Sequence, residues 1–77
     1  MITAYKKWLF KVSPQIAEEL QCSQGEAIGR ILIMDCMQNN PQAFDIVGDI
    51  EDDGWNIETF TKAGDNLIEE LTAEPAN

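Results

Sequence analysis

Carboxylates are the side chains of this sequence that could do chemistry, and most of them lie in its second half. Residues 41–77 contain ten Asp and Glu against one cation, Lys62; they are Asp45, Asp49, Glu51, Asp52, Asp53, Glu58, Asp65, Glu69, Glu70 and Glu74. Carboxylates at close spacing can act as general acid and base, hold a metal ion, or attract a basic protein surface. The rest of the sequence discriminates among these three chemistries.

Catalysis is the least supported of the three. The sequence has no histidine, no glycine-rich phosphate loop and no zinc-type Cys/His cluster. Neither Cys22 nor Cys36 has a base close to it in the sequence that would activate a thiol. A glycosidase needs a carboxylate pair, but 77 residues cannot easily build a substrate cleft around one. We therefore expect no enzymatic activity, no catalytic residue and no cofactor.

The segment from Asp49 to Gly54, with oxygen ligands at alternate positions before a glycine, resembles the opening of a calcium-binding EF-hand loop. The resemblance implies a calcium-responsive module. The later positions depart from the motif, because the eighth is Asn56 and the twelfth, where a bidentate Glu belongs, is Phe60. An acidic turn between helices is the favoured interpretation, and we expect no metal site.

The net charge of −9 is carried by the second half of the chain. In residues 1–40 four cations are balanced by four anions; these residues are Lys6, Lys7, Lys11, Arg30, Glu18, Glu19, Glu26 and Asp35. A potential of negative sign repels nucleic acid and anionic membranes and attracts basic protein surfaces. The expected partner is therefore a basic protein surface, with no direct contact to nucleic acid or membrane.

The expected partner-binding residues are the acidic ones at helical spacing, together with one aromatic: Asp45, Asp49, Asp52, Asp53, Glu58, Glu69 and Trp55. Carboxylates three or four residues apart on a helix are about 5–6 Å from one another, a spacing comparable with that of phosphates along DNA. The surface could imitate nucleic acid toward a basic cleft, or it could be a solvated face that keeps the protein soluble. Trp55 could anchor an interface or close one end of the core.

Helix starts are marked by a capping side chain followed by proline, or by glutamate three residues later. Such signals occur at Ser13-Pro14, Ser23-Gln24-Gly25-Glu26, Asn40-Pro41 and, after a turn at Asp52-Asp53-Gly54, Asn56. The spacing of apolar residues predicts helices over 14–21, 24–38, 43–50 and 57–71, with Gly64 as a kink or break in the last.

We expect an all-α fold, a single compact domain of four or five helices over residues 1–77 with a frayed tail at 72–77. The helix over 24–38 is apolar nearly all round, which predicts a central, buried position with Ile31 and Met34 in the core. The N-terminal dozen residues fit a helix or a short strand. Helix is favoured, because no second segment offers a convincing strand partner.

Residues 16–30, a short helix, a turn opening on Ser23 and a second helix, resemble the helix-turn-helix motif of bacterial and phage regulators. Gln21 stands where that motif usually has glycine, and Arg30 is the only cation on the second helix. Residues 23–28 also resemble the second helix of ribbon-helix-helix repressors, with Trp8 to Val12 as the strand. Both resemblances imply an alternative function, a small transcriptional regulator that could form a homodimer.

In size, acidity and lack of catalytic groups, the chain resembles the small acidic inhibitors carried by phages and mobile elements, including anti-CRISPR proteins and DNA mimics. That resemblance implies inhibition of a basic, nucleic-acid-handling partner by occupation of its positively charged site. The longest apolar run, Ile31 to Met34, is far too short for a membrane span, and Trp8-Leu9-Phe10 is too short for a signal peptide. We therefore expect a cytoplasmic protein with reduced cysteines.

Overall fold

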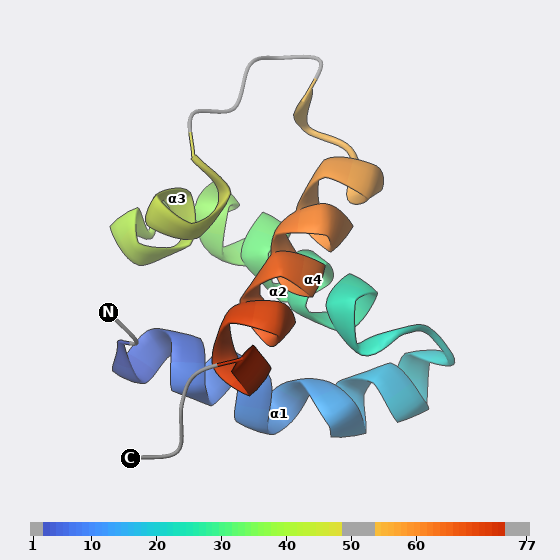
Figure 1. Ribbon diagram of the computed structural model, residues 1–77. Helices are drawn as coiled ribbons and strands as arrows, with labels where there is room; N and C mark the ends of the chain where they lie inside the picture. Colours follow the sequence, from blue (N-terminus) through green and yellow to red (C-terminus); the bar gives the residue numbers. More distant parts are fainter. Residues whose placement is uncertain (1–2, 49–53, 74–77) are drawn as a thin grey trace.

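Four α-helices build the fold in the computed structural model, which describes residues 3–48 and 54–73. They are α1 (Ala4–Leu20), α2 (Gln24–Met37), α3 (Pro41–Val47) and α4 (Ile57–Ala73), and the described residues contain no strand. The prediction of an all-α, compact fold is confirmed. Figure 1 shows α4 crossing α2, with α1 along one side of this pair and α3 beside the end of α2.

The first helix differs from the prediction at its N-terminal half, because α1 begins at Ala4 and runs through Pro14 without a break. Thr3 caps it by accepting a hydrogen bond from the backbone N–H of Lys6 at 3.1 Å. Pro14 has no N–H to donate to the carbonyl of Phe10, four residues earlier. The hydroxyl of buried Ser13 donates to that carbonyl instead, at 3.2 Å. Ser13 therefore supplies the missing hydrogen bond inside the helix and does not cap a new helix.

The three later capping predictions are confirmed. The side chains of Ser23, Asn40 and Asn56 accept backbone N–H bonds at 3.1, 3.0 and 2.9 Å, each at the start of a helix. Glu26 does not complete a reciprocal capping box, because its carboxylate pairs with Arg30 at 3.2 Å. These caps satisfy backbone donors that have no partner inside their helices and so fix where α2, α3 and α4 begin.

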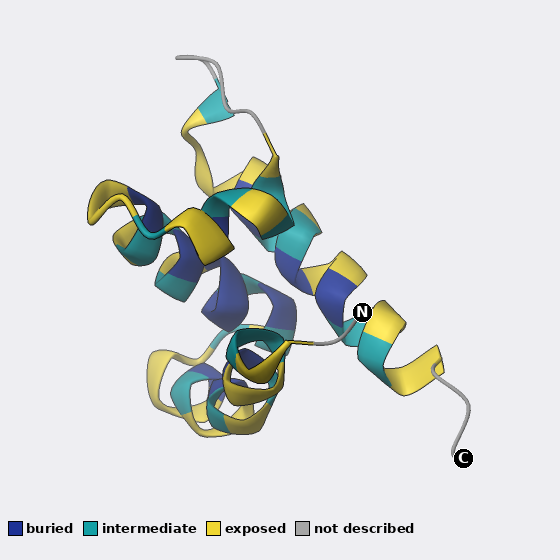
Figure 2. Cartoon of the chain, turned by 90° about the vertical axis from the view of Figure 1, so that its left-hand side faces the viewer, coloured by how far each residue is buried: buried dark blue, intermediate teal, exposed yellow. Residues whose placement is uncertain are grey.

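The core lies where the four helices face one another, and Figure 2 shows the buried residues gathered there. Its largest fully buried apolar side chains are Leu9, Ile28, Leu32 and Phe60. The placement of Ile31 and Met34 in the core is wrong, because Ile31 is half-buried and Met34 is 61% exposed. Although α2 contacts all three other helices, none of them covers its outer side.

Glycines allow α2 and α4 to cross closely. A Cβ atom at Gly29 would lie 2.7 Å from the backbone carbon of Phe60, and one at Gly64 would lie 2.2 Å from the carbonyl oxygen of Gly25. Of the predicted kink or break at Gly64, the break is wrong, since α4 is continuous from Ile57 to Ala73. The helix also extends two residues into the expected tail of 72–77, whose remainder lies outside the described residues.

Candidate protein-binding surface

One edge of α4 carries a row of carboxylates, Glu58, Asp65 and Glu69, which we call the acidic stripe; the Asp65 carboxylate lies beside Gly25 of α2. Their spacing of seven and four residues places them on one side of the helix, and all three are exposed. Glu58 and Glu69 are about 16 Å apart along the helix axis, at 1.5 Å per residue. Exposed Lys62 lies within the stripe and offsets part of its charge, but the three carboxylates leave this edge of α4 net negative.

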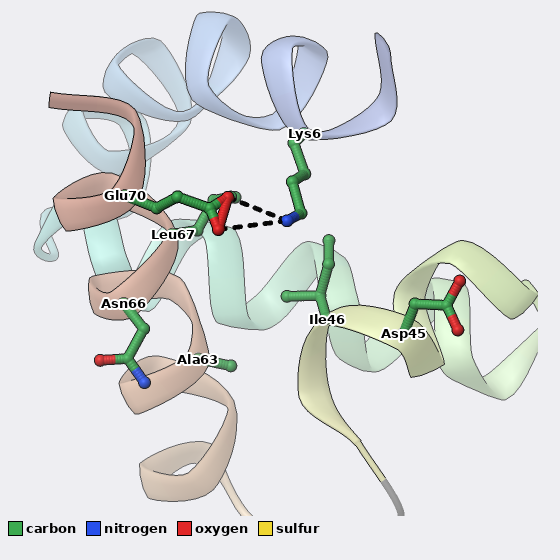
Figure 3. A pocket seen from close by; sticks show the side chains of 7 residues that line it. All are labelled: Lys6, Asp45, Ile46, Ala63, Asn66, Leu67 and Glu70. Carbon is green, nitrogen blue, oxygen red and sulfur yellow. Dashed lines mark hydrogen bonds and ion pairs between the residues drawn. The ribbon is translucent and has the colours of Figure 1, made fainter. Parts of the chain in front are cut away.

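Asp45 lies apart from the acidic stripe, on α3. It borders a cleft of about 230 Å³ between α1, α3 and α4, to which Ile46, Ala63 and Leu67 contribute apolar lining. Figure 3 shows Glu70 and Asp45 on opposite sides of this cleft, with the Asp45 carboxylate directed away from Glu70. The structure therefore brings Glu58 and Glu69 together on one face but places Asp45 on another. Three further predicted residues, Asp49, Asp52 and Asp53, lie outside the described residues.

Two ion pairs neutralise cations elsewhere in the described chain. Lys6 donates to Glu70 at 2.9 Å, and this hydrogen bond holds the pKa of the Glu70 carboxyl below its usual value. Arg30 pairs with Glu26 at 3.2 Å. Within residues 3–48 and 54–73, no ion pair neutralises Asp45 or the acidic stripe. Asp45 and the acidic stripe thus present unneutralised negative charge to solvent in the described structure.

The indole of Trp55 is partly buried against the core and partly exposed to solvent. It packs on Phe44 and Phe60, with ring centroids 6.3 and 5.6 Å away, and is still 41% exposed. The two interpretations of this side chain are therefore compatible, because the ring closes one end of the aromatic core while one part faces outward. This position lies two residues before α4 and three before Glu58.

The segment that resembles a helix-turn-helix has the required turn, since Gln21 adopts the left-handed conformation with φ 55° and ψ 49°. Its second helix is less suited to reading DNA. Gly25 and Gly29, on the early turns of the helix that would face DNA in that motif, are buried against α4, and Arg30 is paired with Glu26. Residues 8–12 are helical, so the strand that a ribbon-helix-helix fold needs is absent from this described segment.

Both cysteines of the described residues are free thiols. No cluster of three or more potential metal ligands occurs within the described part of the chain. Cys36 is buried, and burial together with the charge of Asp35 raises the pKa of its thiol, which disfavours the nucleophilic thiolate. Cys22 is half-buried and also unpaired.

A second exposed surface was missed by sequence reasoning. Met34 and Met37 on α2 are 61% and 71% exposed, and Ile57 on α4 is exposed nearby beside Ile33 and Arg30. The signal that could have indicated it is the helical spacing of Glu26, Arg30, Met34 and Met37, which places two ionised residues on the same side of α2 as the two methionines. Ionised residues are seldom found on the buried side of a helix, so their presence indicates an exposed side.

Among the described helices, none combines the length and apolar character that a membrane crossing requires. Comparisons with protein-family models, with curated proteins and with solved structures found no match to this chain.

Proposed function

We propose that this protein is an acidic binding module that inhibits or regulates a basic, nucleic-acid-handling protein by occupying its positively charged site. The observation that supports it best is the acidic stripe of α4, whose carboxylates are exposed and not neutralised by ion pairs in the described structure. A cytoplasmic location, where such partners handle DNA or RNA, is part of the proposal.

The physical basis is electrostatic substitution. A nucleic-acid site is lined with Lys and Arg that neutralise phosphates, and carboxylates held on a helix can meet the same cations. Asp65 and Glu69 are one turn apart, and α4 is anchored by buried Phe60 and Leu67. The stripe is therefore pre-organised, so its binding loses little conformational entropy.

The remaining predicted residues extend this surface in the proposal. Asp45 adds a carboxylate on α3, and exposed indole area of Trp55 beside α4 can supply an apolar contact at the margin. Asp49, Asp52 and Asp53 are included on the strength of the sequence alone. Lys62 lowers the charge of the stripe and would face an anion, or solvent, in the complex.

A DNA-binding regulator is the second candidate, favoured by one observation, the left-handed turn at Gln21 between α1 and α2. The net charge of −9 and the pairing of Arg30 with Glu26 oppose it. Retention of a specific duplex by the purified protein would favour this candidate over the first.

The test of the proposed function starts from the partner. The purified protein is used to capture proteins from its source cells, and each captured protein is then purified and assayed directly. We expect a basic nucleic-acid-binding protein whose complex weakens between about 50 and 200 mM salt and whose nucleic acid competes with this protein for binding. Binding that is indifferent to both salt and nucleic acid would contradict the proposal.

A further inference from the structure

The methionine face, which we define as Arg30, Ile33, Met34, Met37 and Ile57, is an apolar surface on the outer side of α2. Four of these residues, all except Met37, line an open hollow of about 320 Å³ between α2 and the start of α4. Met37 continues the same side of α2 one turn beyond Ile33 and Met34. Met34, Met37 and Ile57 are 61%, 71% and 37% exposed.

This face is uncovered because the other helices pack against the opposite side of α2. Ile28, Leu32 and Cys36 are buried against the other helices, and the glycines bring α4 against the same side. The side of α2 opposite the core carries two methionines, whereas the solvent-exposed side of a helix usually carries charged residues. Methionine is flexible and polarizable, which suits it to contact with a partner helix of varied shape.

Charge decides between a second copy of this chain and a different protein as the occupant. Two copies carry −9 each and repel one another as they approach. At the face itself, Arg30 is neutralised in place by Glu26 at 3.2 Å, and exposed Glu58, which follows Ile57 in the sequence, has no ion pair in the described structure. The margin is therefore net negative and complements a segment that carries Lys or Arg beside its apolar residues.

We propose that the methionine face binds an amphipathic, basic helix of the partner protein. Apolar side chains of that helix contact Met34 and Met37, and its cations lie toward Glu26 and Glu58. The proposal rests on the proposed function insofar as the partner is basic. It adds that binding requires apolar contact on α2 as well as charge on α4.

The first experiment uses a defined probe, a synthetic helical peptide of about 18 residues with leucine at i, i+3, i+4 and i+7 and lysine elsewhere. The protein is labelled with ¹³C in its methionine methyl groups and titrated with the peptide. We expect saturable shifts of the Met34 and Met37 signals. A peptide of the same composition in scrambled order should leave both signals unchanged.

The second experiment compares matched variants. Met34→Gln with Met37→Gln should weaken binding of the peptide by about tenfold or more, because two exposed side chains lose apolar contact area. Leu20→Gln, which removes a 51% exposed apolar side chain on α1 outside the face, should change the affinity less than twofold. Thermal melting of both variants checks that the fold is retained.

Several outcomes would overturn the inference. They are an absence of binding, equal binding of the scrambled peptide, unchanged affinity of the double methionine variant, or a dimer in sedimentation that the methionine substitutions dissociate. Glu58→Gln with Glu69→Gln, tested against the natural partner, separates the two proposals. If that variant loses partner binding while the methionine variant retains it, the proposed function stands and the methionine face does not contribute.

Discussion

Gly64 of α4 lies so close to Gly25 of α2 that a Cβ atom on Gly64 would be 2.2 Å from the Gly25 carbonyl oxygen. The obstacle is backbone, which cannot turn aside as a flexible side chain can. Two helices in direct backbone contact bring their neighbouring side chains, among them Ile28, Phe60 and Leu67, into one core. The same contact places Asp65 of the acidic stripe beside α2, where a Cβ atom on Gly25 would lie 1.7 Å from the Asp65 carboxylate.

Gly64→Ala should therefore destabilise the protein. Alanine favours a helix over glycine by about 1 kcal/mol, but overpacking at this contact should cost more, for a net loss of about 1–3 kcal/mol. For a domain of this size each kcal/mol lowers the Tm by about 4–8 °C. Thermal unfolding followed by circular dichroism measures this, with Asn66→Ala on the exposed side of α4 as the control that should melt near wild type.

Leu32 and its neighbour Ile31 should respond very differently to truncation. Leu32 is fully buried in the core, so Leu32→Ala should cost about 2–5 kcal/mol, a large fraction of the stability of a small domain. Ile31 is half-buried, and Ile31→Ala should cost about 1–2 kcal/mol. Urea denaturation of the two variants measures both values. Equal losses would mean that α2 is rotated relative to the structure described.

Tyr5 links α1 to α2 by donating its hydroxyl to Asp35 at 2.5 Å. Burial, and then the hydrogen bond and charge of Asp35, raise the pKa of Tyr5 well above its usual value of 10.0. A raised pKa stabilises the fold fully below the unfolded-state pKa, and this contribution is lost as the pH rises above about 10. Wild type should therefore lose stability in that range by more than Tyr5→Phe does.

The measurement is direct because Tyr5 is the only tyrosine of the chain, so its titration can be followed by ultraviolet absorbance. Asp35→Asn should lower the Tyr5 pKa without returning it to 10.0, since burial remains. Cys36, whose pKa burial also raises, acts with the same sign in every variant. A wild-type Tyr5 that titrates near 10 in the folded protein would contradict the contact.

Local signals in the sequence predicted the starts of α2, α3 and α4, whereas the start of α1 and the packing of the helices were not predicted. Ser23 and Asn40 cap helices by bonds within three residues, so their role is visible in the sequence. Pro14 and Gly64 also have strong local tendencies, to start a helix or to break one. In the structure the hydroxyl of Ser13 donates to the Phe10 carbonyl that Pro14 leaves without a backbone donor, so the helix continues. Gly64 is required because α2 and α4 cross closely there.

For the candidate site, the sequence predicted exposure but not arrangement. Asp45, Glu58 and Glu69 are exposed as expected, because their helices turn apolar residues inward. Which of them share a face depends on how α3 packs beside α4, and this is set by tertiary contacts. Met34 illustrates the same limit, since hydrophobic character alone did not indicate which side of α2 would remain uncovered.

Duplex DNA should not bind detectably to this protein at a physiological salt concentration of about 0.15 M. Lys6 and Arg30 are already paired with Glu70 and Glu26, and the long-range field of the chain repels phosphate. A gel-shift titration up to about 1 μM protein, at the tight end of ordinary non-specific binding, tests this. Tighter binding that is lost in Arg30→Ala would instead support the regulator related to helix-turn-helix proteins.

Partner association should depend on the predicted carboxylates of the described second half. Replacing Asp45, Glu58 and Glu69 by Asn, Gln and Gln removes three charges at exposed positions, so the fold should be retained or slightly stabilised by reduced repulsion. Association with the partner should slow by about tenfold or more at low salt and should lose much of its salt dependence, because steering charges act mainly on the on-rate. Stopped-flow or surface-based kinetics provide both quantities.

The matched control is Glu18→Gln with Glu19→Gln, compared with Glu58→Gln and Glu69→Gln alone. Both pairs remove two exposed carboxylates and change the net charge equally, but the first pair lies on α1, away from the acidic stripe. A site-specific role predicts slow association only for the α4 pair, whereas general attraction by net charge slows both pairs equally. If the α4 pair associates as fast as wild type at low salt, the acidic stripe is a solvated face and the proposed function is wrong.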